Sequence, residues 1–174
     1  MLQNLFDKSV LIFGCGNILF GDDGFGPAVA DHLQQNCSLP PHVLVMDVGT
    51  SIREILFDLA LSDTKPEKLI VIDAVDYPNR RPGELFEIPV EGIPAEKVAD
   101  FSLHQFPTVN ILKELRDHTG IEIKILAAQV EAMPTEVRPG LSGPIREAVG
   151  EACRLIMENL QSGENGGSYA APAA

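Results

Sequence analysis

Positive charge is scarce in this 174-residue chain, which has 13 Lys and Arg residues against 25 Asp and Glu. The resulting formal net charge of -12 disfavours nucleic acid and anionic lipid as partners. No apolar run is long enough to span a bilayer, and the amino-terminal segment lacks a basic region followed by a long apolar stretch. The three cysteines are odd in number and show no C-x-x-C pairing, which favours a reducing compartment over a disulfide scaffold. We therefore expect a cytoplasmic protein.

Motifs of several common enzyme classes are also missing. Gly16 and Gly21 have the spacing of a phosphate-binding loop, but Asp22 and Asp23 stand where that loop needs Lys and Ser or Thr. A dinucleotide fingerprint would need glycine at position 19, which is Leu19. The sequence has no H-E-x-x-H and no G-x-S-x-G motif. Nucleotide binding, metalloprotease chemistry of the H-E-x-x-H type and serine-hydrolase chemistry are therefore not predicted.

The first half of the chain alternates between strands and helices. Three apolar segments are continuous, as expected of parallel strands that are covered on both faces. They are SVLIFGC (residues 9–15), HVLVMDV (42–48) and KLIVIDAV (68–75). Residues 25–36, with Pro27 in the first turn, and residues 51–62, with Ser51 as the cap, have helical spacing. The pattern predicts a βαβαβ unit.

The second half continues this alternation. It contains a predicted strand at residues 83–90, a helix at 107–120, a strand at 121–131 and a helix at 142–161. The whole pattern predicts an α/β fold with a twisted, mostly parallel sheet and helices on both faces. We expect a single domain over residues 1–162, followed by a flexible tail at residues 163–174.

Acidic residues lie at or just after the carboxyl ends of the first three predicted strands. Ligands of open α/β sheets bind beyond the carboxyl ends of the strands, so these acids should meet at one edge. They are Asp22 and Asp23, then Asp47, then Asp73 with Asp76. Two carboxylates about 4 Å apart repel by roughly 4 kcal/mol at an effective dielectric near 20, which raises a pKa or recruits a cation. His104 can add an imidazole, and such a set is compatible with nickel, zinc, iron or manganese.

Each of these residues also has a purely structural interpretation. Asp22 and Asp23 precede a helix and can stabilise the positive end of its dipole. Asp47 and Asp73 can be turn or capping residues at strand ends. His104 can be a structural histidine. No single residue decides between a metal site and these alternatives.

Four segments together resemble a known family, the maturation endopeptidases of nickel-iron hydrogenases. They are GCGNILFGDDGFGP (residues 14–27), MDVGTS (46–51), LIVIDAVDYPNRRPGELFEI (69–88) and SLHQFP (102–107). Their order and spacing match the family, and the resemblance extends from residue 9 to about residue 160. The combination of a G-N-x-L-x-x-D-[DE]-x-x-G signature, a strand-ending D-A and a downstream histidine is specific.

The resemblance implies a cytoplasmic protease that removes a short carboxy-terminal extension from the precursor of a hydrogenase large subunit after nickel insertion. We also expect the protein to be a monomer. The resemblance implies that Asp23, Asp73 and His104 bind the metal, which is nickel presented by the substrate. Asp47 matches the acid of a D-x-G-T loop near the same cleft and is expected to contribute to cleavage. The chain departs from the family pattern at Val48, where we expect glycine.

Two other functions fit parts of the pattern. A signalling receiver domain also has acids after its first strand and an Asp at the end of its third, but the last predicted strand lacks the terminal lysine of such a site. A nickel-binding chaperone would use the same ligands without cleaving its partner. We expect the protease.

Overall fold

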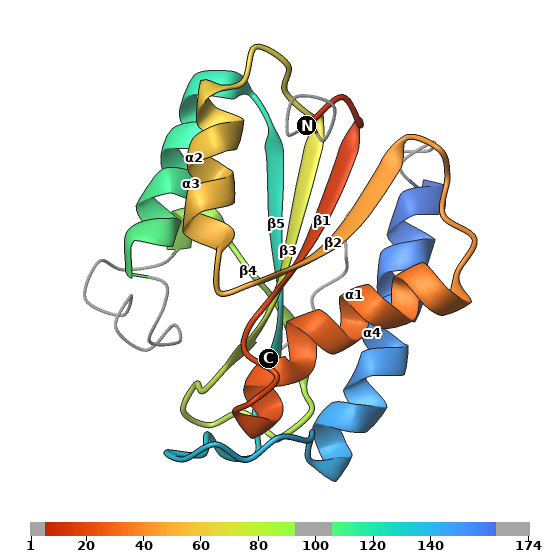
Figure 1. Cartoon of the computed structure of the whole chain (residues 1–174), viewed down its shortest axis with the longest axis vertical. Helices are drawn as coiled ribbons and strands as arrows, with labels where there is room; N and C mark the ends of the chain where they lie inside the picture. Colours follow the sequence, from red (N-terminus) through yellow and green to blue (C-terminus); the bar gives the residue numbers. More distant parts are fainter. Residues whose placement is uncertain (1–5, 93–105, 163–174) are drawn as a thin grey trace.

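A five-stranded sheet lies between two pairs of helices in the computed structural model, which describes residues 6–92 and 106–162 (Figure 1). The strands are β1 (Val10–Cys15), β2 (Val43–Gly49), β3 (Lys68–Val75), β4 (Leu85–Ile88) and β5 (Glu122–Gln129). Their order across the sheet is β2-β1-β3-β5-β4. All neighbouring pairs are parallel except β4 and β5, which are antiparallel. The predicted α/β class and mostly parallel sheet are confirmed.

Each face of the sheet is covered by two helices. These are α1 (Phe25–Asn36), α2 (Ile52–Leu61), α3 (Phe106–Thr119) and α4 (Gly143–Ser162). In Figure 1, α2 and α3 lie together on one face, and α1 and α4 lie together on the other. Separate apolar clusters fill the two interfaces, and the alternate side chains of β1 divide between them, with Phe13 in one and Ile12 in the other. This double covering explains why the predicted parallel strands are continuously apolar.

The nine predicted elements are all present, and the largest error concerns β4. The predicted strand covered residues 83–90, whereas β4 is Leu85–Ile88 and a short 3-10 helix, η2, follows at Val90–Gly92. Gly83 has a φ of 81°, a turn conformation, and Pro89 has no N–H to donate to a ladder. Ser51 precedes α2 as predicted, but its side chain makes no capping hydrogen bond.

Two expectations about the chain are affected by the range that the structure describes. The predicted tail at residues 163–174 lies outside the described residues, so its flexibility stays a prediction. Within residues 6–92 and 106–162, no helix has the length and apolarity that crossing a membrane requires.

Candidate active site

The carboxyl ends of β1, β2 and β3 bring two of the predicted acids to opposite sides of β1. Gly14 of β1 pairs with Asp47 of β2 on one side and with Ile72 of β3 on the other. Asp73 follows Ile72, so Asp47 and Asp73 flank the end of β1. A short 3-10 helix, η1 (Gly21–Gly24), follows β1 and carries Asp23. The edge predicted from the strand order is therefore acidic.

The pairing between β1 and β2 contains an irregularity at Val48, the position where the sequence departs from the family pattern. Gly14 pairs with Asp47, but the next residue, Cys15, pairs with Gly49, so Val48 is the extra residue of a bulge. Its side chain is buried in the core beneath α2 and α3. Bulges of this kind redirect neighbouring side chains near functional sites. The valine therefore packs inward and does not occupy the acidic edge.

Asp23 is held against the loop that follows β1. Its side chain is only 3% exposed, and Oδ2 accepts a hydrogen bond of 2.8 Å from the backbone N–H of Asn17. Gly16 has a φ of 134°, and a Cβ at this residue would overlap the carbonyl oxygen of Asp23. The glycine therefore allows the loop to fold back closely enough to fix the Asp23 carboxylate.

Asp73 is fully buried at the end of β3. Burial raises the pKa of its carboxyl well above the ordinary value, and the nearby Asp23 charge raises the pKa further. The N–H of Ala74 donates a 2.8 Å hydrogen bond to Oδ1 of Asp73, and this bond lowers the pKa, although by less than burial raises it. Two buried carboxylates that destabilise each other form a donor pair that a divalent cation would stabilise.

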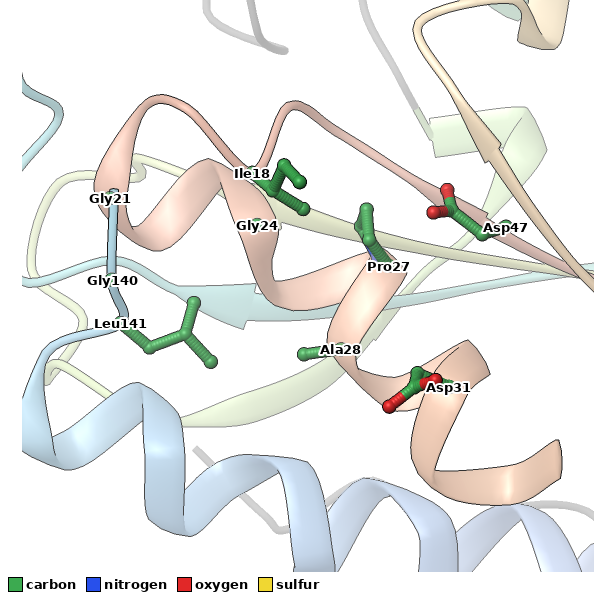
Figure 2. Close-up of a pocket in the computed structure, with 9 residues that line it drawn as sticks. All are labelled: Ile18, Gly21, Gly24, Pro27, Ala28, Asp31, Asp47, Gly140 and Leu141. Atoms are coloured by element: carbon green, nitrogen blue, oxygen red, sulfur yellow. The ribbon is translucent and has the colours of Figure 1, made fainter. Parts of the chain in front are cut away.

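Asp47 differs from this pair because it is exposed. Its Oδ1 accepts a 2.8 Å hydrogen bond from the N–H of Gly49, so the alternative interpretation as a turn residue describes part of its role. Asp47 also borders a surface pocket of about 360 Å³, together with Asp31 of α1 (Figure 2). Asp23 and Asp73 do not line this pocket. The exposed Asp47 carboxylate is therefore accessible to a substrate from the pocket side.

The thiol of Cys15 lies within electrostatic range of all three acids. Burial raises its pKa well above the ordinary value, and the charges of Asp73, Asp47 and Asp23 raise it further. A thiol in this environment stays protonated, and Cys15 packs as a small apolar residue of the core. The structure therefore gathers three of the four predicted site residues around the end of β1.

The fourth predicted site residue, His104, lies outside the described residues, so its part in the site stays a prediction. Across residues 6–92 and 106–162, the structure contains no group of three or more His, Cys, Asp or Glu side chains arranged to hold a metal ion. Near the end of β1, the described residues supply the buried carboxylates of Asp23 and Asp73.

Asp22 has a structural role that the sequence did not reveal. Its Oδ1 accepts a 2.7 Å hydrogen bond from the N–H of Ser142, and its Oδ2 accepts 2.9 Å bonds from the Ser142 hydroxyl and the Glu131 N–H. These partners are 109 and 120 residues away along the chain, at the two ends of the loop between β5 and α4. No local pattern could have indicated them. The two adjacent acids therefore differ, because Asp22 anchors a distant loop while the charge of Asp23 acts on Asp73.

Replacing Asp22 by asparagine should destabilise the protein. The asparagine amide has one acceptor oxygen, so it cannot accept all three hydrogen bonds from Ser142 and Glu131, and its NH2 group would face one of their N–H donors. We expect the free energy of unfolding to fall by about 2–3 kcal/mol in urea titrations. Ser142→Ala, which removes only the hydroxyl, should cost about 1 kcal/mol. The exposed Asp58→Asn is the control, with no change expected. A loss below about 1 kcal/mol for Asp22→Asn would instead support the helix-dipole interpretation.

The receiver-domain alternative is not supported by the end of β5. Gln129 stands at this end, its amide donates a 2.9 Å hydrogen bond to Asp76, and its Oε1 accepts a 2.9 Å bond from the N–H of Tyr77. Asp73, which would be the phosphoryl acceptor, is fully buried. Among the described residues, the end of β5 therefore provides no lysine for a receiver site, and Asp73 is not an accessible carboxylate.

Comparisons with known proteins agree on one family. The family model for hydrogenase maturation protease matches residues 27–159. Over 156 residues the chain is 38% identical to a protein of Methanocaldococcus jannaschii provisionally named a hydrogenase maturation protease, with 88% of this chain and 97% of that protein covered. Over 158 residues it is 33% identical to the delta subunit of the coenzyme F420 hydrogenase of Methanothermobacter thermautotrophicus, with 89% and 96% covered.

A solved structure shows the same fold. The hydrogenase maturating endopeptidase HybD of Escherichia coli is similar with a TM-score of 0.73 and 26% sequence identity, and the match covers 90% of this chain and 94% of that one. The family model spans most of the chain, including β2, β3 and the helices on both faces. The chain therefore belongs to the hydrogenase maturation protease family and is a peptidase.

Proposed function

We propose that this protein is the endopeptidase that removes the carboxy-terminal extension from the large-subunit precursor of a nickel-iron hydrogenase after nickel has been inserted. Membership of the family supports the activity and the class of substrate. One observation from the chain itself supports the site: Asp23 and Asp73 are both buried, and burial together with the charge of Asp23 raises the pKa of Asp73. A pair of this kind fits the recognition of a cation at the end of β1.

In this proposal the nickel is part of the substrate, since the precursor brings it to the protease. Asp23 and Asp73 offer carboxylate oxygens, and His104 is expected to add an imidazole nitrogen, a set of ligands that suits nickel. Recognition then depends on the metal, because a precursor without nickel offers no cation for the two carboxylates to bind. The protease would therefore select precursors that have completed nickel insertion.

We assign the proton transfer to Asp47. It is exposed, it is fixed by the N–H of Gly49, and it lies across β1 from Asp73. A carboxylate in this position can take the proton of an attacking water as its oxygen bonds to the scissile carbonyl carbon, and can return that proton to the leaving amine when the C–N bond breaks. Nickel on the substrate would supply the alternative, a metal-polarised water. The variant Asp47→Asn distinguishes these two mechanisms. It removes the general base of the first mechanism, whereas a metal-polarised water does not require the Asp47 carboxylate.

We further propose that the protein works as a monomer in the cytoplasm. All three cysteines, Cys15, Cys37 and Cys153, are free thiols in the structure, which suits a reducing compartment. Size-exclusion chromatography with light scattering tests the oligomeric state.

The proposed activity is tested by incubating the purified protein with a nickel-loaded precursor and measuring the mass of the large subunit. We expect the subunit to lose the mass of a short carboxy-terminal peptide. A nickel chaperone without protease activity would bind the precursor or the free metal and leave the mass of the subunit unchanged. If the mass of the large subunit in the nickel-loaded precursor stays unchanged, the proposal is wrong.

A further inference from the structure

Exposed apolar side chains are concentrated beside the candidate active site. In the described part of the chain, six large apolar side chains are exposed. Four of them lie on the two loops that follow β1 and β5, and we call them the loop patch: Ile18, Leu19, Met133 and Val137. The other two, Phe57 and Leu61, lie on α2. Single exposed apolar residues need no explanation, but a group at the rim of a site indicates an interaction surface.

The two loops that carry the loop patch are joined by their backbones. Phe20 and Arg138 form an isolated parallel bridge. The N–H of Arg138 donates a 2.8 Å hydrogen bond to the carbonyl of Leu19, and the N–H of Gly21 donates a 2.9 Å bond to the carbonyl of Arg138. The hydrogen bonds of Asp22 secure both ends of the second loop. The loop patch is therefore held in place before any partner binds, which reduces the entropy that binding would cost.

A pocket with two carboxylates adjoins the loop patch. Ile18 and Leu141 line one part of the pocket, and Figure 2 shows Asp31 and Asp47 on the opposite side from Leu141, with Pro27 and Ala28 between. A volume of about 360 Å³ can accept one long side chain or two small ones. The apolar lining suits a hydrocarbon stem, and the two carboxylates suit a positively charged end.

We propose that the loop patch and this pocket form the docking surface for the precursor, and that they bind a segment with apolar side chains next to a lysine or arginine. The inference rests on the proposed function, because Asp47 belongs both to the pocket and to the candidate active site. Charge complementarity selects the occupant: the pocket carries two acids in a chain whose formal net charge is -12. In this proposal Asp31 determines which substrate binds, and it takes no part in the chemical step.

The chain supplies its own control surface. Phe57 and Leu61 are 49% and 81% exposed, compared with 62% for Ile18 and 64% for Val137. The two pairs are therefore similar in size and exposure, but the α2 pair lies on a helix that packs with α3 and not on the loops beside the pocket. Replacement of either pair by serine removes exposed apolar area and leaves the core intact.

The test compares two double variants, Ile18→Ser with Val137→Ser and Phe57→Ser with Leu61→Ser, in cleavage of a nickel-loaded precursor and in binding to it. We expect the loop-patch variant to raise KM and the precursor Kd about tenfold or more, and the α2 variant to change neither by more than about twofold. Thermal unfolding of both variants should match the wild type. Equal effects of the two variants, or a larger effect of the α2 variant, would overturn the docking surface.

A charge reversal tests the pocket separately. Asp31→Lys should lower the association rate about tenfold at low salt and reduce its dependence on ionic strength, whereas Asp58→Lys on α2 should have little effect. Identical rates for the two variants would exclude Asp31 from recognition. If the wild type binds and cleaves the precursor but these comparisons fail, only the docking surface is wrong. If the wild type does not cleave the precursor at all, the proposed function itself fails.

Discussion

Replacing Asp73 by asparagine should abolish cleavage of the precursor while leaving the protein at least as stable as the wild type. The substitution keeps the size of the side chain and an oxygen that can accept the hydrogen bond from the N–H of Ala74. It removes the charge that we assign to binding the substrate's nickel, so we expect the cleavage rate to fall by more than about a hundredfold. The measurement is the rate of mass loss from the nickel-loaded precursor.

The stability of the same variant should depend on pH in a direction set by the raised pKa of Asp73. Its carboxyl has a native pKa well above the ordinary 3.8 because of burial and the charge of Asp23. The native state therefore binds this proton more tightly than the unfolded chain, and the wild type loses stability as the pH rises from the ordinary value through the native pKa. Asp73→Asn avoids this loss. Its free energy of unfolding should exceed that of the wild type at about pH 7, and the difference should shrink towards about pH 4.

His104→Ala is the companion to this experiment. It should also abolish processing, and the melting temperature should stay nearly unchanged. A large loss of stability in this variant would favour the structural-histidine interpretation. For Asp73→Asn, the contradicting result is retained cleavage, or a free energy of unfolding well below that of the wild type at neutral pH.

Gly26→Ala should unfold the protein or destabilise it by about 3 kcal/mol or more. Gly26 lies in the first turn of α1, which packs against β1 and β3. A Cβ at this residue would overlap the carbonyl oxygen of Cys15 and would lie 2.6 Å from the carbonyl oxygen of Ile72. Both obstacles are backbone atoms of central strands, so neither can move aside cheaply. Urea titration of the purified variant, or its failure to accumulate as soluble protein, provides the measurement.

Gly150→Ala is the matched control, since this glycine is also helical but has open space where the Cβ would be placed. Alanine is the better helix former, so the variant should gain about 0.5–1 kcal/mol. If Gly26→Ala were as stable as the wild type, α1 could not be seated as closely on the strand ends as the structure shows. The position of Asp23 relative to Asp73 would then also be in doubt.

The fold was largely predictable because its signals are local and repeated. Each parallel strand is continuously apolar, and each helix between them shows helical spacing, so the order of elements follows from the pattern alone. The ends of β4 were not predictable. The ends of β4 depend on the turn conformation at Gly83 and on the missing N–H of Pro89. The sequence between these two residues fits the predicted longer strand as well as it fits the shorter observed one.

The candidate site was predictable only where it follows from strand order. Asp47 and Asp73 flank β1 because parallel strands end at the same edge, and Asp23 reaches that edge through the loop after β1. The role of Asp22 depends on partners more than a hundred residues away. The loop patch was equally hidden, because Leu19 and Val137 become neighbours only through the bridge between Phe20 and Arg138. Long-range backbone contacts of this kind leave no periodic signal in a sequence.

The most direct test of the central claim compares a nickel-loaded with a nickel-free precursor as substrates of the wild-type protein. Both are incubated under identical conditions, and the mass of the large subunit is followed over time. If Asp23, Asp73 and His104 recognise the substrate's nickel, the nickel-loaded precursor alone should be shortened. Equal processing of the two precursors would contradict recognition through the metal and would leave the buried Asp23 and Asp73 pair without its proposed role.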